Sequence, residues 1–217
     1  FHDNGGTAGT KIYNAGLHGS KGSPWLGGTK SPSFWRWPGT LQEHDVDALT
    51  AHIDIFPTLA ELTGITLDDR SRTQIEGRSL APLLKDAKAA WSDRLLVTHV
   101  GRWPKGADPS DSKYAQCSVR ETRWHLVSEG RGKTGKKWEL FDVAADPGET
   151  HDVATAHPEI VARLDGEYDR WWASVQPSLV NENATGPKVN PFKELYWKQF
   201  GGGPAAEESK AMELDAR

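Results

Sequence analysis

The sequence predicts an α/β fold: the edge of a large mixed sheet flanked by helices, followed by a small C-terminal antiparallel sheet with a packed helix. Residues 1–6 resemble the end of a buried strand that opens into a glycine-rich loop. Residues 45–64 carry apolar side chains at helical spacing. Three short runs, 114–120, 123–128 and 137–143, are separated by turn residues, which is typical of an antiparallel sheet.

Prolines and glycines predict the boundaries of the first elements. Residues 33–37 lie between two prolines and are expected to form a short strand. In the helix predicted over residues 45–64, Pro57 predicts a break or kink, because proline lacks the amide hydrogen of a helical residue. Gly64 is expected to cap the end of that helix.

The second half of the chain has the clearest helix. A short helix is expected over residues 77–84 and a strand over residues 94–100. The helix predicted over residues 158–175 begins with Pro158, which suits a first turn. Its apolar residues follow helical spacing and form one wide stripe: Ile160, Leu164, Tyr168, Trp171, Trp172 and Val175.

Composition excludes several classes of protein. The chain has 217 residues and a formal net charge of −4, so it offers no overall basic character for binding nucleic acid. No apolar run approaches the ~20 residues that span a bilayer. Cys117 is the single cysteine, which excludes an internal disulfide.

The first residues hold candidate ligands for a divalent cation and an oxyanion. Asp3 and Asn4 offer carboxylate and amide oxygens, the ligand types that Ca²⁺ and Mg²⁺ take in proteins. Lys21 follows in the glycine-rich loop and supplies a compact positive charge. The alternative is that Asp3 and Asn4 only shape a turn and that Lys21 is a solvated loop residue.

A second group of candidates follows the strand predicted over residues 94–100. His99, Arg102 and Trp103 share one loop and suit contact with a sugar or aryl group, although a purely structural loop is the alternative. Cys117 is followed by Ser118-Val119-Arg120 on a predicted strand, and we interpret it as a small buried apolar residue rather than a nucleophile.

Several motifs in register resemble the C-terminal half of type I sulfatases, which belong to the alkaline phosphatase superfamily. The resemblance covers roughly residues 1–177 and predicts that further protein precedes Phe1. The motifs, in chain order, are Asp3-Asn4-Gly5, Lys21-Gly22, Gly27-Gly28, Trp37-Pro38-Gly39, Asp54-Ile55-Phe56-Pro57-Thr58-Leu59, Gly77-Arg78-Ser79-Leu80, Trp91-Ser92-Asp93-Arg94, Glu139-Leu140-Phe141-Asp142, Asp146-Pro147-Gly148-Glu149 and His157-Pro158.

The resemblance implies roles for matching positions. Asp3 and Asn4 would be ligands of Ca²⁺, with Mg²⁺ as the alternative ion, and Lys21 would act in catalysis and contact the sulfate. The cysteine or serine that becomes formylglycine would lie in the part that precedes this chain. His18 stands where many relatives carry arginine, and Leu26 where a glutamate is common, so the substrate pocket is expected to differ. We expect His18, His99 and Arg102 to bind the substrate.

The resemblance also implies an organisation. Residues 1–90 would be the C-terminal part of the sulfatase catalytic domain, residues 91–177 a small antiparallel subdomain with its helix, and residues 178–217 an irregular tail. The expected function is part of a sulfatase that hydrolyses sulfate esters, a sulfated carbohydrate being one candidate substrate. This chain alone is expected to be inactive, because it has no candidate nucleophile.

Other functions and partners stay open at this point. The alternative functions are a phosphate or phosphonate monoester hydrolase of the same superfamily and a non-catalytic carbohydrate-binding module. The expected protein partner is the N-terminal portion of the same protein or a second copy of the chain, since an incomplete sheet would expose apolar surface. The resemblance favours a periplasmic or secreted location.

Overall fold

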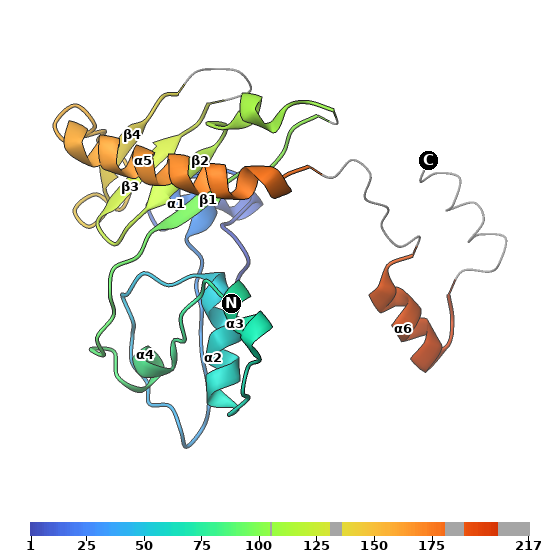
Figure 1. The fold of residues 1–217 in the computed structure, drawn as a ribbon. Helices are drawn as coiled ribbons and strands as arrows, with labels where there is room; N and C mark the ends of the chain where they lie inside the picture. Colours follow the sequence, from blue (N-terminus) through green and yellow to red (C-terminus); the bar gives the residue numbers. More distant parts are fainter. Residues whose placement is uncertain (105, 131–135, 181–188, 204–217) are drawn as a thin grey trace. The chain divides into compact units, whose positions relative to one another are not determined.

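The computed structural model describes residues 1–104, 106–130, 136–180 and 189–203, and its elements are shown in Figure 1. The chain divides into two compact units, Phe1–Pro177 and Ser178–Arg217. The α-helices are α1 (Leu26–Thr29), α2 (Ile55–Leu62), α3 (Asp69–Gln74), α4 (Ala81–Lys85), α5 (Pro158–Val175) and α6 (Pro191–Phe200). The 3-10 helices are η1 (Ala8–Lys11), η2 (His52–Asp54), η3 (Pro109–Ser112) and η4 (Gln176–Ser178).

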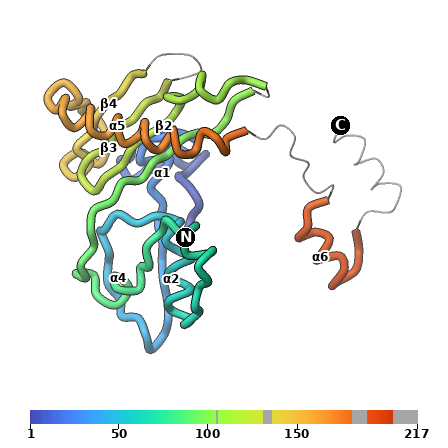
Figure 2. Tube along the Cα trace, viewed as in Figure 1, coloured from blue at the N-terminus to red at the C-terminus, as the bar shows by residue number. Residues whose placement is uncertain are grey.

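The first unit contains one four-stranded antiparallel sheet in the order β1-β2-β3-β4. Its strands are β1 (Leu96–His99), β2 (Cys117–Arg120), β3 (Trp124–Ser128) and β4 (Glu139–Asp142). Each strand pairs with the next one along the chain, and the Cα trace in Figure 2 follows this meander. The small antiparallel sheet predicted from the sequence is confirmed.

The long helix α5 packs against one face of this sheet (Figure 1). Val119, Leu126 and Leu140 lie opposite one another on adjacent strands, and all three are fully buried. Successive strand residues alternate between faces, so these three side chains share a face. From α5, Leu164, Tyr168 and Trp172 are buried. The helix predicted over residues 158–175 is confirmed residue for residue, with Pro158 in its first turn.

The opposite face of the sheet packs against the N-terminal part of the chain. Val127 and Phe141 form a buried cluster with Trp25, Leu26 and Val143, and Leu17 packs against it. The sheet is therefore covered on one face by α5 and on the other by the segment around α1. This second layer fixes the loop between Leu17 and Trp25, which contains Lys21.

The predicted large mixed sheet is not seen in the described part of the chain, so this part of the prediction is corrected. Residues 1–6 and 33–37 form no strand, and the Phe1 side chain is 66% exposed. A strand persists only where a neighbour satisfies its backbone hydrogen bonds, and apolar residues between prolines do not supply that neighbour. The described strands all belong to the small sheet.

The helix predicted over residues 45–64 is shorter than expected. It is observed as η2 followed by α2. Pro57 causes no break because it lies in the first turn of α2, where an amide hydrogen would have no acceptor within the helix. Gly64 follows the helix with φ of +69°, as predicted for a glycine cap. Of the helix predicted over residues 77–84, only the second half is helical, as α4 (Ala81–Lys85), and residues 77–80 form no helix.

Three α-helices were not predicted: α1, in the segment expected to be a glycine-rich loop, α3 and α6. Helix α3 is short and polar, and Asp68 caps it by accepting a hydrogen bond from the Ser71 amide at 2.6 Å. Helix α6 belongs to the second unit, in a segment predicted to be irregular. Asn190 caps α6 by accepting from the Phe192 amide at 2.9 Å, and none of the helix residues is buried among the described residues. No helix in the described part of the chain is long and apolar enough to cross a bilayer.

The 3-10 helix η2 and the helix α2 that follows it leave apolar side chains exposed. Ile53, Phe56 and Leu59 are each about half exposed, at 47%, 56% and 47%. Ile53 and Phe56 also line a pocket with residues 74–77. The sequence predicts exposed apolar surface in this half of the chain, and the described residues show it here and also at Ile12, Tyr13 and Phe34, which are 91%, 80% and 86% exposed.

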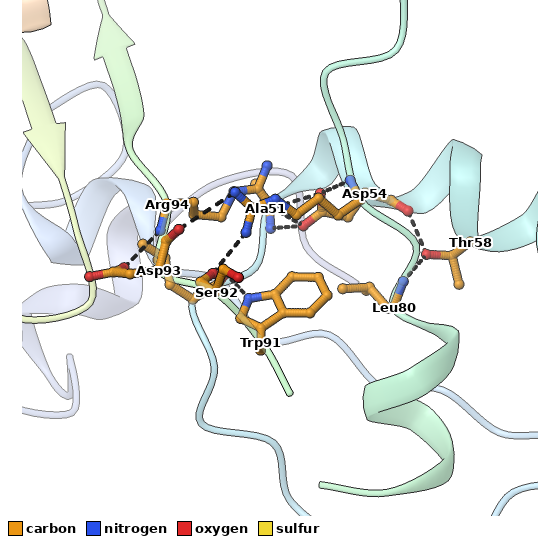
Figure 3. A network of polar contacts seen from close by, with 10 residues as sticks. Ala51, Asp54, Thr58, Leu80, Trp91, Ser92, Asp93 and Arg94 are labelled. Carbon is orange, nitrogen blue, oxygen red and sulfur yellow. Dashed lines mark hydrogen bonds and ion pairs between the residues drawn. The ribbon is translucent and has the colours of Figure 1, made fainter. Parts of the chain in front are cut away.

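A buried ion pair joins the elements that precede the sheet (Figure 3). The Asp54 carboxylate is completely buried and lies 2.7 Å from the Arg94 guanidinium. It also accepts hydrogen bonds from the backbone amides of Ala51 at 2.7 Å and Arg78 at 2.8 Å. The charged pair therefore ties the start of α2 to the segment that leads into β1.

The hydroxyl of Thr58 extends this network toward α4. It donates to the Asp54 carbonyl at 2.5 Å and accepts from the Leu80 amide at 2.8 Å. Gly77 approaches the Ile53 carbonyl so closely that an added Cβ would lie 1.9 Å from that oxygen. Three sequence motifs of the sulfatase resemblance, around Asp54, Gly77 and Arg94, therefore meet in one structural network.

We predict that Asp54→Ala destabilises the fold by about 3–5 kcal/mol, because Arg94 would be left as a buried charge without a partner. The free energy of unfolding from urea denaturation measures this loss. Arg163→Ala is the matched control, since Arg163 pairs with Glu121 at 2.6 Å but keeps 45% of its side chain exposed. Its cost should not exceed about 1 kcal/mol. Similar losses for the two variants would contradict this role of Asp54.

Candidate functional site

The segment that carries Asp3 and Asn4 runs beside residues 28–32. The His2 amide donates to the Pro32 carbonyl at 3.2 Å, and the Gly5 amide donates to the Gly28 carbonyl at 2.9 Å. A ring nitrogen of His52 lies 2.9 Å from the His2 carbonyl oxygen. Asp3 lies between these anchors with an exposed side chain, while Asn4 is half-buried.

The Lys21 loop meets this segment through its backbone. The Lys21 amide donates to the Gly6 carbonyl at 2.9 Å. Lys21 therefore lies beside Gly6, which is three residues after Asp3. Gly19 and Gly22 flank the turn with φ of +79° and +87°, values that favour glycine. The structure thus places Lys21 beside the segment that holds the two proposed metal ligands.

Glycines permit this close approach. A Cβ on Gly5 would lie 1.8 Å from the Gly27 carbonyl oxygen, and a Cβ on Gly28 would lie 2.3 Å from the Ser23 carbonyl oxygen. At Gly27 the added atom would lie 2.4 Å from the His18 carbonyl oxygen. The glycine-rich composition is therefore a packing requirement, because backbone contacts backbone at each of these positions.

The side chains of Asp3 and Lys21 have no internal role in the described part of the chain. Both are exposed, and neither makes a hydrogen bond or an ion pair with another described residue. Their backbone is fixed while their charged groups stay available, an arrangement that suits ligand binding.

His18 lies against the same loop. Its ring stacks on Trp25, with the ring centroids 4.0 Å apart and the planes inclined by 22°. The His18 carbonyl accepts from the Gly27 amide at 2.6 Å. These two contacts therefore hold His18 against the loop that contains Lys21.

His99 lies on the other face of the sheet. It is opposite Cys117, and its ring centroid is 5.2 Å from that of Trp172 on α5. One ring nitrogen lies 2.9 Å from the Ser112 carbonyl, and the other accepts from the Gly101 amide at 2.8 Å. Burial lowers the pKa of His99, and the backbone hydrogen bonds oppose that shift only in part.

His99 is consequently a neutral ring with both nitrogens engaged, and the structure does not bring it together with Lys21. Arg102 lies in the exposed loop that follows β1. Substrate binding by His99 and Arg102 stays a prediction, and a ligand of His99 would have to replace an internal hydrogen bond.

Cys117 is a core residue, as predicted from the sequence. It is fully buried on β2, and burial raises the pKa of its thiol to about 12. A thiol held in its neutral form is a poor nucleophile. Cys117 is therefore excluded as the nucleophile of this chain.

Glu149 is a residue whose role sequence reasoning missed. Its side chain is buried, and one carboxylate oxygen accepts from the Leu26 amide at 2.8 Å. The other oxygen lies 2.5 Å from Nδ1 of His125, which is also buried. Burial lowers the pKa of His125, although Glu149 opposes the shift, so a neutral ring donates from Nδ1. The sequence offered only the turn Asp146-Pro147-Gly148 before it, which says nothing of a partner at residue 26.

Asp3 and Asn4 fit Ca²⁺ by ligand type but do not complete a site. Ca²⁺ takes six to eight oxygen ligands, and these two side chains supply a carboxylate and an amide oxygen. No group of three or more His, Cys, Asp or Glu side chains that could hold a metal occurs in the part of the chain that the structure describes. Further ligands would have to come from outside these residues.

A family profile described as "N-sulphoglucosamine sulphohydrolase, C-terminal" matches residues 27–170. The chain belongs to this sulfatase family. The matched region of this sulfatase chain includes the whole sheet, Glu149 and most of α5, which confirms the resemblance inferred from the motifs.

Curated relatives give the same assignment. Steryl-sulfatase of Homo sapiens is 35% identical over 109 residues, which cover 49% of this chain and 16% of the human protein. Arylsulfatase K of Mus musculus is 26% identical over 178 residues, which cover 79% of this chain and 29% of that protein. This sulfatase chain therefore spans a third or less of the length of these two relatives.

A solved structure shares the fold. The crystal structure of Ps i-CgsB in complex with k-i-k-neocarrahexaose matches with a TM-score of 0.59 and 20% identity. The match covers 91% of this sulfatase chain and 39% of that chain. At this identity the likeness shows the fold alone.

We predict that Gly5→Ala opens the contact between the N-terminal segment and the Lys21 loop and lowers stability by about 1–3 kcal/mol, because its Cβ overlaps fixed backbone. Hydrogen exchange at the Gly5 and Lys21 amides and thermal unfolding measure the two effects. Gly9→Ala is the control, since nothing lies within 4 Å of its added Cβ. Unchanged exchange in Gly5→Ala would show that this contact does not hold the loop.

Proposed function

We propose that the protein carrying this chain hydrolyses sulfate esters, and that this segment supplies Lys21 to the sulfate and Asp3 and Asn4 to a calcium ion. The observation that carries the proposal is the 2.9 Å hydrogen bond from the Lys21 amide to the Gly6 carbonyl. It joins the backbone of the Lys21 loop to the segment that carries Asp3 and Asn4, which supports a shared site. Membership of a sulfatase family supports the reaction type.

The charge of a sulfuryl group explains why such residues are needed. Its oxygens carry negative charge that must be held while the ester bond breaks, and fixed cationic donors stabilise that charge. The Lys21 ammonium is a compact donor that can contact one such oxygen. A bound Ca²⁺ would supply Lewis acidity at the same group. Asp3 and Asn4 would orient the cation, and the fixed backbone would keep Lys21 in place.

The nucleophile is assigned outside this chain. Cys117 is buried with a raised thiol pKa, so a formylglycine would have to come from another part of the protein. We infer that residues 1–217 alone do not turn over substrate. A sulfated carbohydrate is the proposed substrate class, supported by the k-i-k-neocarrahexaose with which Ps i-CgsB was crystallised. His18 is proposed to face this substrate from beside the Lys21 loop.

We predict that Lys21→Ala lowers kcat/KM of the full-length protein for an aryl sulfate by about 10²–10³-fold, because one preorganised donor to the sulfuryl oxygens is removed. Lys11→Ala is the control, since Lys11 is an exposed lysine earlier in the same region. Its kcat/KM should stay unchanged. Steady-state kinetics with and without a calcium chelator measure both variants, and chelation should abolish turnover by the parent protein.

The alternative ester class is tested in the same assay. Turnover of an aryl phosphate in preference to the aryl sulfate would overturn the proposed reaction in favour of phosphate monoester hydrolysis. Equal losses in Lys21→Ala and Lys11→Ala would overturn the role of Lys21. Binding of a glycan without hydrolysis by the full-length protein would favour a carbohydrate-binding module.

A further inference from the structure

Glu149 joins two segments that are far apart in the sequence. It follows β4, with a backbone φ of +54° that is uncommon for a residue other than glycine. Its carboxylate accepts from the His125 ring on β3, 24 residues away, and from the Leu26 amide, 123 residues away. Each donor uses its own carboxylate oxygen, so the side chain bridges the sheet and the first residue of α1.

Leu26 is the residue through which this bridge reaches the Lys21 loop. Gly27 and Gly28 follow it, and the loop folds over them with the Gly27 amide donating to the His18 carbonyl at 2.6 Å. A Cβ on Gly28 would lie 2.5 Å from the Ser20 carbonyl oxygen, so the loop and the helix are in direct backbone contact. A displacement of Leu26 would therefore carry the neighbours of Lys21 with it.

Stability alone does not explain a carboxylate at this position. The side chains of Glu149 and His125 are 0% and 1% exposed, and removing a charge from water is costly. A well-packed apolar side chain commonly gives equal or greater stability. What an apolar side chain cannot do is accept two directed hydrogen bonds from separate segments, and this directionality sets where α1 begins.

We propose that Glu149 is a positioning residue for Lys21, acting through Leu26 and α1 to hold the lysine where the sulfate binds. This inference rests on the proposed role of Lys21 as a sulfate ligand. Glu149 lies between the sheet and the Lys21 loop. It acts only through the backbone that it anchors.

A double-mutant cycle in the full-length protein tests the proposal. Glu149→Ala should lower kcat/KM for an aryl sulfate by roughly 10-fold to 100-fold, the scale expected when a reacting group is misplaced. In the Lys21→Ala background the same change should cost less than about 3-fold, because residues that act as a unit are not additive. A purely structural role would give the same fold-loss in both backgrounds, and that result would overturn the proposal.

The conservative variant Glu149→Gln provides a rescue. Its amide oxygen can accept from the Leu26 amide, while its amino group can donate to Nδ1 of the other neutral tautomer of His125. Its kcat/KM should stay within about 3-fold of the parent value, since both directed contacts remain. A loss as large as that of Glu149→Ala would overturn the proposal.

The matched control is Glu121→Ala. Glu121 pairs with Arg163 on α5 at 2.6 Å, and none of its described contacts lies in the Lys21 loop. Its kcat/KM should equal that of the parent at a temperature well below the unfolding transition of every variant. A loss matching that of Glu149→Ala would mean that any lost ion pair in the sheet suffices, which would overturn the assignment.

Hydrogen exchange separates this inference from the proposed function. If the parent protein hydrolyses no sulfate ester, the proposed function fails, and the positioning of the loop is judged by exchange at the Lys21 and Gly27 amides. Faster exchange in Glu149→Ala but not in Glu121→Ala would support the anchoring of the loop by Glu149. Unchanged exchange would overturn it.

Discussion

The candidate site depends on a contact between two pieces of backbone that have no room for a side chain between them. Gly5 lies against Gly27 and Gly28, and a Cβ on Gly5 would lie 1.8 Å from the Gly27 carbonyl oxygen. This contact aligns the N-terminal segment with the Lys21 loop, and the hydrogen bond from Lys21 to Gly6 continues it. Glycine is needed here because any larger residue would push the two segments apart. The backbone of Lys21 lies beside the segment that carries Asp3 as a consequence.

Two buried carboxylates then fix the surroundings of this contact. Asp54 accepts from Arg94 and from two backbone amides, and so joins α2 to the segment leading into β1. Glu149 accepts from His125 and from the Leu26 amide, and so joins the sheet to α1. Each carboxylate satisfies donors from segments that are distant in the sequence. The Lys21 loop is therefore held in place by its contacts with the small sheet.

Local patterns were sufficient to predict the elements that depend on local physics. The helical spacing of Leu164, Tyr168 and Trp172 predicted α5, because that stripe needs only one apolar surface to cover it. The short strands of the sheet were predicted for the same reason, since each pairs with its neighbour along the chain. Gly64 was predicted as a cap from its own conformational freedom.

Elements that depend on distant partners were not predicted. Residues 33–37 have the composition of a strand, but the described residues offer no strand beside them, and Phe1 is exposed rather than buried. The role of Glu149 was missed because its partner Leu26 lies 123 residues away. The motif around Asp54 was noted as a resemblance, yet its physical reason, a buried charge shared with Arg94, became clear only from the fold. For the candidate site, the sequence supplied the residue types, and the structure showed that the two segments carrying them are joined through their backbones.

The most direct test of the account is a crystal structure of the full-length protein grown with calcium and an unreactive sulfamate analogue of an aryl sulfate. The account predicts a calcium ion at about 2.3–2.6 Å from an Asp3 carboxylate oxygen and the Asn4 amide oxygen. It also predicts the Lys21 Nζ at about 3 Å from an oxygen of the sulfuryl group. A calcium ion held by other residues, or a sulfuryl group bound with the Lys21 ammonium turned into solvent, would contradict it.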